Sequence, residues 1–216
     1  MKNQTLDSKL LFAQNAITNA LNNEPIRASF AVYGYDENRL NTGLGLYENA
    51  ATLQNRHKKE YGEQFAATDA LNLAKAEANK LYMTHVKVAR IALNGNRSAE
   101  ESLQLGHKRK VSLSGWLKEA KAFYANALSD ENILSAMAGY GITPEILEKG
   151  KAEVDTVETS YNRQLKEKGE AQAATQERDK AFDELQNWMS DFVAIARIAL
   201  QEQPQYLEAL AIVEPS

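Results

Sequence analysis

Apolar residues recur at alternating spacings of three and four along long stretches of the chain, which is the period of an amphipathic helix. The clearest stretch carries them at Leu147, Val154, Val157, Tyr161, Phe182, Leu185, Met189, Phe192, Ala196 and Ala199. No window shows the strict alternation, or the enrichment in Val, Ile and Thr, that is typical of strands. The pattern predicts an all-α protein built from antiparallel, up-and-down helix bundles.

This pattern occurs twice. Shifting the sequence by 107 positions aligns the chain with itself without a gap, and 33 of the 109 aligned pairs are identical. One matched block is 86–93 (VKVARIAL) with 193–200 (VAIARIAL). We therefore predict a tandem duplication of a helical unit of about 107 residues, with repeat 1 at residues 1–107 and repeat 2 at 108–216. Such a fusion resembles a dimer joined into one chain.

Each repeat is expected to contain the same series of helices. Thr143-Pro144 opens the long apolar stretch of repeat 2 with a capping oxygen and a ring suited to the first turn, and Asp36-Glu37 holds the same place in repeat 1. Further helices are expected at 6–22 and 113–129, from Pro25 to Gly34 and from Asp130 to Gly141, and at 98–101 and 204–212.

Two interpretations of the long apolar stretches compete. A polar centre with Gly62 in repeat 1 and Gly169 in repeat 2 is typical of a hairpin tip, because glycine reaches the left-handed conformation that ends a helix. The apolar phase, however, runs from Val154 to Phe182 in four heptads, as a single long helix of about 58 residues and roughly 87 Å would require. The hairpin is the favoured prediction, since a single helix would place polar residues at its central seam.

Composition narrows the class of protein. With 25 basic and 29 acidic residues the net charge is -4, which disfavours general nucleic-acid binding. The absence of cysteine excludes disulfides and thiolate metal sites. The first residues lack the apolar core of a signal peptide, and the longest apolar runs are too short to span a bilayer. We expect a cytoplasmic protein that does not bind membranes.

No group of residues matches a catalytic, cofactor or metal site. A di-metal helix bundle needs Glu-x-x-His pairs, and none occurs. His57 precedes Glu60 in reversed order, and repeat 2 lacks that histidine. His85 takes the place of Phe192 on an apolar stripe, which predicts a core-edge histidine with one hydrogen bond, and His107 belongs to a basic junction. We expect no metal, no cofactor and no classical catalytic apparatus.

Two further pairs of residues are shared by the repeats. Gly43-Leu44-Gly45 is too short for a phosphate-binding loop, and Gly43 matches Gly150, which predicts a close approach of two helices. Arg90 and Arg197 interrupt otherwise apolar blocks. They are expected to snorkel along the bundle surface or to pair with an acidic residue, and an anion site is the alternative.

The most strongly shared polar stretch is 55–68 with 162–175, where nine of fourteen positions are identical. Packing explains shared apolar residues, whereas shared charges at a hairpin tip need turn geometry, helix capping or a binding role. The candidate interaction residues at the predicted tips are Arg56, Lys59, Glu60, Glu63, Arg163, Lys166, Glu167 and Glu170.

The sequence favours a non-enzymatic protein-interaction or scaffold module with an unknown protein partner, and self-association into a homo-oligomer stays open. The alternative is a small-molecule or cofactor-binding bundle with a cavity lined by Tyr47, Tyr82, His85 and Trp188. An enzyme of unfamiliar mechanism is the third hypothesis.

Overall fold

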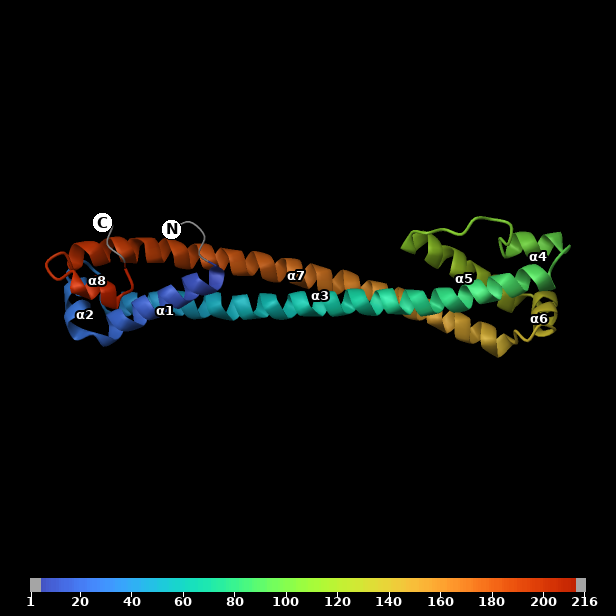
Figure 1. Ribbon diagram of the computed structural model, residues 1–216, viewed down its shortest axis with the longest axis horizontal. Helices are drawn as coiled ribbons and strands as arrows, with labels where there is room; N and C mark the ends of the chain where they lie inside the picture. The colour runs from blue at the N-terminus through green and yellow to red at the C-terminus, as the bar shows by residue number, and fades with distance from the viewer. Residues whose placement is uncertain (1–4, 213–216) are drawn as a thin grey trace. The chain divides into compact units, whose positions relative to one another are not determined.

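The computed structural model describes residues 5–212, and within this range every regular element is a helix. The prediction of an all-α protein is confirmed. The helices are α1 (Leu6–Asn22), α2 (Glu24–Ala31), α3 (Glu37–Ala92), α4 (Arg97–Ser102), α5 (Leu113–Ser129), α6 (Glu131–Ala138), α7 (Pro144–Ala199) and α8 (Gln205–Ala209) (Figure 1). None of these helices has an apolar stretch sufficient to cross a membrane.

Helix lengths agree between the two halves of the chain. Helices α1 and α5 both have 17 residues, α2 and α6 both have 8, and α3 and α7 both have 56. The bounds of each pair differ by 107 residues, which is the offset of the sequence repeat. The short helices α4 and α8 differ by one residue in length.

Side-chain oxygens cap the starts of α1, α2, α5 and α6. Thr5 accepts a hydrogen bond from the Ser8 backbone N–H at α1, and Ser112 does the same for Gly115 at α5. Asn23 and Asp130 cap α2 and α6. A capping oxygen satisfies one of the backbone N–H groups that the first helical turn leaves without a partner. These residues therefore fix where the paired helices begin.

The hairpin prediction is wrong. Helices α3 and α7 continue without a break through Gly62 and Gly169, and neither glycine has the positive φ of a helix end. A glycine inside a helix costs only about 1 kcal/mol relative to alanine. The neighbouring Glu, Lys, Gln and Ala residues are strong helix formers, so the helix tolerates that cost. The structure has the single long helix that the heptad phase allowed.

The chain forms two compact units. Unit 1 comprises residues 1–61 with 170–216, and unit 2 comprises residues 62–169. The compact units therefore do not coincide with the sequence repeats 1–107 and 108–216. Each unit combines the front of one repeat with the back of the other, because each long helix begins in one unit and ends in the other.

In unit 1, helices α1, α2 and α8 pack around the first part of α3 and the last part of α7 (Figure 1). Its core contains small residues of α1, such as Ala13 and Ala16, and a stacked pair formed by Phe30 and Phe192 with ring centroids 5.2 Å apart. The Asn19 side chain donates a hydrogen bond of 2.7 Å to the Ala209 carbonyl and so joins α1 to α8.

Unit 2 is built in the same way from α5, α6, α4, the first part of α7 and the last part of α3. Tyr82, Phe123 and Tyr124 form an aromatic cluster at its centre, with ring centroids 5.2 to 6.2 Å apart. The Asn126 side chain donates to the Ser102 carbonyl at 2.8 Å. This bond is the counterpart of Asn19 to Ala209 in unit 1, since the residues on both sides correspond at the 107-residue offset.

Candidate functional site

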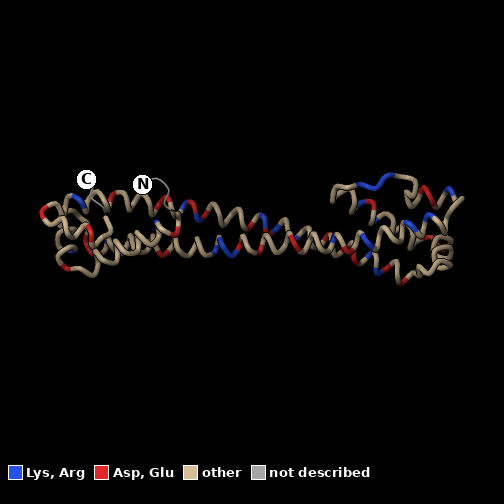
Figure 2. Tube along the Cα trace, viewed as in Figure 1, with Lys and Arg blue, Asp and Glu red and all other residues tan. Residues whose placement is uncertain are grey.

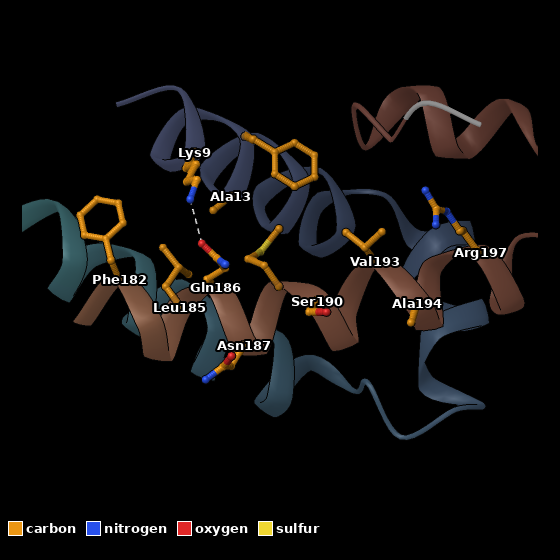
Figure 3. Close-up of a pocket in the computed structure, with 12 residues that line it drawn as sticks. Lys9, Ala13, Phe182, Leu185, Gln186, Asn187, Ser190, Val193, Ala194 and Arg197 are labelled. Atoms are coloured by element: carbon orange, nitrogen blue, oxygen red, sulfur yellow. Dashed lines mark hydrogen bonds between the residues drawn. The ribbon is translucent and has the colours of Figure 1, made fainter. Parts of the chain in front are cut away.

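A cleft of about 520 Å³ lies between α1 and α7 in unit 1 (Figure 3). Its apolar wall is formed by Phe12 of α1 with Leu185, Met189 and Val193 of α7. Ser190, Gln186 and Asn187 add polar groups along α7. The cleft therefore combines an apolar surface with hydrogen-bonding groups, as binding sites for flexible ligands do.

A positively charged side chain lies near each end of the cleft. The Lys9 ammonium donates a hydrogen bond of 2.8 Å to Oε1 of Gln186, and Arg197 lies eleven residues further along α7 (Figure 3). Among residues 5–212, neither Lys9 nor Arg197 forms an ion pair. Both cations are thus available to a negatively charged group placed in the cleft.

The equivalent place in unit 2 is covered by the chain itself. We call residues 104–110, which are part of the connection between α4 and α5, the covering segment; its basic residues are visible in Figure 2. Arg109 donates to the Tyr82 hydroxyl at 2.6 Å, and the Lys110 backbone N–H donates to the Glu119 carboxylate at 2.9 Å. Leu105 is buried, and its carbonyl accepts a hydrogen bond of 3.0 Å from Arg90.

The cleft of unit 1 and the covered surface of unit 2 are formed by matching residues of the two repeats, but these residues differ in charge and polarity. Lys9 and Gln186 of unit 1 correspond to Trp116 and Asn79 of unit 2, which are also joined by a 2.8 Å hydrogen bond. The groups of unit 2 that hold the covering segment are replaced, because Glu119 becomes Phe12 and Tyr82 becomes Met189. Unit 1 therefore lacks the acceptors that bind a basic segment at this place.

Arg90 and Arg197 were expected to snorkel along the bundle surface or to pair with an acidic residue, and the structure gives Arg90 a different partner. Arg90 donates to a main-chain carbonyl of the covering segment, rather than pairing with an acidic residue. Its counterpart Arg197 is exposed at the cleft of unit 1. The shared arginine thus lies at matching positions of the two units, next to the covering segment in unit 2 and at the cleft in unit 1.

The paired glycines make room for aromatic rings rather than for a second helix backbone. A Cβ at Gly43 would collide with the indole of Trp188, and a Cβ at Gly150 would collide with the ring of Tyr124. The sequence predicted a close approach of two helices at these positions, and the structure instead places an aromatic side chain of another helix against each glycine. Gly45 has open space around it and no such role.

The histidines occupy the places expected of structural residues. His85 is 2 % exposed, and its Nδ1 lies 3.0 Å from the Tyr124 hydroxyl, which confirms a core histidine with one hydrogen bond. Burial lowers the pKa of His85. His57 lies 2.9 Å from the Arg178 guanidinium, and burial followed by this positive charge lowers its pKa. A neighbouring guanidinium also disfavours a metal cation at His57.

The candidate interaction residues lie in the middle of α3 and α7, so their placement at tips is wrong. Arg56 is in contact with Glu177 at 2.5 Å and with Glu60 at 3.8 Å in unit 1. Arg163 lies 3.8 Å from Glu167 in unit 2, where Lys166 also approaches that carboxylate. Lys59, Glu63 and Glu170 have interaction partners as well. These charges have partners within the protein, Glu167 among them is buried, and a docking role for the set stays a prediction.

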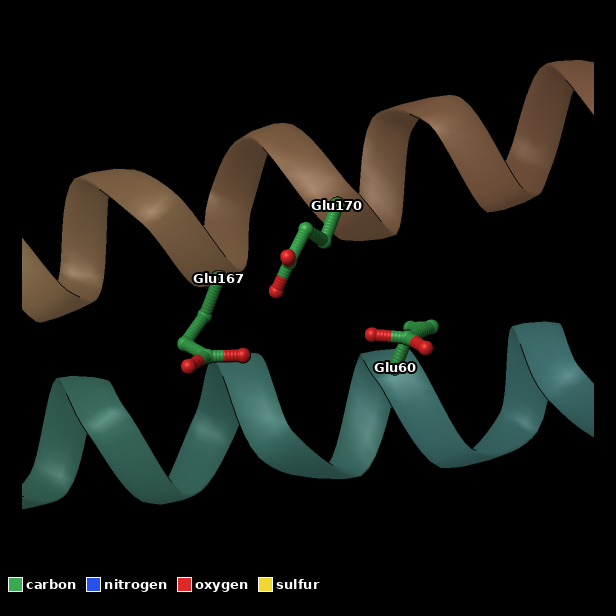
Figure 4. Close-up of side chains that lie close together, drawn as sticks. All are labelled: Glu60, Glu167 and Glu170. Carbon is green, nitrogen blue, oxygen red and sulfur yellow. The ribbon is translucent and has the colours of Figure 1, made fainter.

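Figure 4 shows three of these carboxylates, which belong to Glu60 on α3 and to Glu167 and Glu170 on α7. Glu60 and Glu170 are part of unit 1, whereas Glu167 is part of unit 2. Acidic side chains of this kind are common without a cation, and we assign no metal site to them.

The residues predicted to line one cavity are divided between the two cores. Tyr47 and Trp188 pack in unit 1, whereas Tyr82 and His85 pack in unit 2. Neither core contains all four side chains. The sequence did not single out the cleft between α1 and α7, although a signal was present in the repeat differences Lys9 against Trp116 and Phe12 against Glu119.

A second surface feature occurs once in each unit. Tyr33 and Tyr140 lie in the turns that follow α2 and α6, and they are 44 % and 58 % exposed. Both turns have the same backbone hydrogen bonds and continue into a glycine with φ of +77° or +80°. This bond pattern closes the helix end and holds the tyrosine backbone in place.

Comparison with family models, with characterised proteins and with solved structures finds no match to this chain. The class of protein is therefore set by the geometry alone. Within residues 5–212 it is a two-unit helical protein with a cleft between α1 and α7 in unit 1, a covering segment at the equivalent place in unit 2, and an exposed tyrosine at matching positions of both units.

Proposed function

We propose that this chain is a non-enzymatic protein-interaction module that presents two equivalent binding surfaces, one on each unit. The observation that carries the proposal is the exposed tyrosine on a closed turn, at Tyr33 in unit 1 and Tyr140 in unit 2. Tyrosine contributes a large apolar ring and a hydroxyl at low entropic cost, which is why it is enriched at protein interfaces.

Packing does not account for the identity of these side chains. The glycine that follows each tyrosine is required by its positive φ, whereas the turn itself needs no aromatic ring before that glycine. In unit 1 the neighbouring Val32 is 78 % exposed and enlarges the apolar surface. An exposed aromatic residue kept at the same place in both repeats supports a role in contact with a partner.

The proposal includes the origin of the two surfaces. We infer that the chain arose by tandem duplication of one helical unit, whose two copies run antiparallel along their long helices and exchange those helices' second halves. Matched helix bounds at an offset of 107 residues support this origin. A module of this kind binds two copies of a partner, or two like sites on one partner, with a gain in avidity.

Site-specific photo-crosslinking tests the proposal. A benzophenone-bearing phenylalanine is introduced in place of Tyr33, of Tyr140 or of Leu73, an exposed apolar residue inside α3 that serves as the control. We expect the same partner protein to be attached from positions 33 and 140 and not from position 73. Different adducts at the two tyrosines, or the same adducts at the control position, would contradict the proposal.

A further inference from the structure

The α1–α7 cleft of unit 1, which is a pocket within residues 5–212, has a counterpart in unit 2 that a segment of the chain itself occupies. In unit 2 the equivalent place holds seven residues of the chain's own covering segment, bound through a main-chain carbonyl on Arg90 and a main-chain N–H on Glu119. There the surface of α5 and α3 holds a segment that turns at Gln104, where φ is +53°, and then runs without regular secondary structure through residues 108–110. Since α1 and α7 form the equivalent surface in unit 1, the same backbone geometry is available for a peptide from outside.

The charges in unit 1 define which peptide fits. Unit 2 offers the Glu119 carboxylate to a basic segment, whereas unit 1 has Phe12 at that position and cations at Lys9 and Arg197. Replacing Tyr82 by Met189 removes the hydroxyl that accepts from Arg109 and leaves an apolar wall. The cleft thus suits a segment with aliphatic side chains between acidic ones, since opposite charges stabilise each other at a partly buried surface.

The distance between the cations sets the spacing of the acidic residues. Lys9 is bonded to Gln186, and from Gln186 to Arg197 there are eleven residues of α7, about 16 Å at the helical rise. An extended peptide advances about 3.3 Å per residue. Two acidic side chains about five positions apart therefore reach both cations.

We infer that the α1–α7 cleft of unit 1 binds an extended peptide segment of a partner protein, with two acidic residues about five positions apart and apolar residues between them. This inference rests on the proposed interaction function and names the chemistry of a partner at a different surface from the exposed tyrosines. Lys9 and Arg197 bind the two carboxylates, and Phe12, Leu185 and Met189 contact the apolar side chains.

The test uses the full chain and a fluorescein-labelled eight-residue peptide with two glutamates five positions apart and leucines between them. A control peptide carries lysines in place of both glutamates. Fluorescence anisotropy at low salt is expected to give saturable binding for the acidic peptide and at least tenfold weaker binding for the basic one. Raising the salt concentration should weaken the binding of the acidic peptide, because salt screens exposed charges.

Protein variants locate the binding. Lys9→Glu and Arg197→Glu are each expected to weaken the binding of the acidic peptide at least tenfold. Ser190→Trp, which fills the cleft without changing its charge, should weaken it as well. Lys118→Glu makes the same charge change on the exposed face of α5 in unit 2, and it should alter binding less than twofold. Thermal melting of each variant verifies that it is folded.

Several results would overturn the inference. Equal binding of both peptides, or binding that Lys9→Glu, Arg197→Glu and Ser190→Trp leave unchanged, would remove the peptide site. Displacement of the peptide by decanoate at a lower concentration than by unlabelled peptide would assign the cleft to a small amphipathic acid instead. Absence of peptide binding together with a shared photo-adduct at positions 33 and 140 would overturn this inference alone, whereas absence of both results would also overturn the proposed function.

Discussion

At the scale of single residues, the two cores use different chemistry at matching positions. Unit 2 contains the hydrogen-bonded pair of His85 and Tyr124, and unit 1 has Phe192 and Ile17 in the same places. All four side chains are buried. A buried polar pair costs little when both members are satisfied and much more when one partner is lost. The pair also makes the stability of unit 2 sensitive to pH.

The pH dependence has a definite sign. Burial lowers the pKa of His85 below the 6.5 of a free imidazole, so below about pH 6.5 the unfolded chain binds more protons than the folded one. The stability contributed by neutral His85 is therefore complete above pH 6.5 and is lost as the pH falls below it. We predict that the double variant His85→Phe, Tyr124→Phe loses less stability than the wild type between pH 7.5 and pH 5, measured by urea unfolding.

The single variant His85→Phe is the control for this prediction. It leaves the buried Tyr124 hydroxyl without a partner and should be less stable than the double variant by about 1 to 3 kcal/mol at pH 7.5. His57 also has a lowered pKa and remains in every variant, so some pH dependence will persist. An unchanged pH slope in the double variant would show that His85 does not carry the effect.

At the scale of helices, the sequence predicted the elements well and their continuation poorly. The apolar period and the capping residues located the helix starts, including Pro144 at the beginning of α7. The apolar period could not decide whether the chain turns at Gly62 and Gly169. Apolar residues four heptads apart fit one continuous helix, and they also fit two separate helices joined by a turn. The cleft could not be predicted from the sequence because it depends on which helices face each other. Two repeats with the same apolar pattern do not show which helix of one repeat packs against which helix of the other.

The glycines of the long helices should respond to alanine in opposite ways. Gly62→Ala and Gly169→Ala meet open space within a continuous helix and should each stabilise the protein by about 0.5 to 1 kcal/mol. Gly43→Ala and Gly150→Ala force Trp188 or Tyr124 to move, and we expect each to destabilise it by about 1 to 3 kcal/mol. Urea unfolding of the four variants gives the comparison. Destabilisation by Gly62→Ala would indicate a left-handed glycine and hence the hairpin.

At the scale of the whole molecule, each unit joins parts of the chain that are far apart in sequence. The hydrogen bond from Asn19 to Ala209 spans 190 residues, and the contact of Arg56 with Glu177 spans 121. Unit 1 therefore closes only when both ends of the described chain have met, whereas the residues of unit 2 are contiguous. Contacts of long sequence separation slow folding, since the entropy of closing the loop is lost before the contacts form.

The central claim is that the first part of α3 packs with the last part of α7 and not with the rest of its own repeat. Because the sequence has no cysteine, pairs of introduced cysteines test this without interference. The variant Arg56→Cys, Glu177→Cys joins two positions whose native side chains touch in unit 1. In the variant Arg56→Cys, Thr68→Cys, the positions are twelve residues apart on one helix, about 18 Å.

Treatment of dilute protein with a short bis-maleimide, followed by peptide mass spectrometry, measures which pair becomes joined within one chain. The account predicts efficient crosslinking between positions 56 and 177 and none between 56 and 68. Crosslinking between 56 and 68 without crosslinking between 56 and 177 would mean that the chain turns back near Gly62, and it would contradict the account.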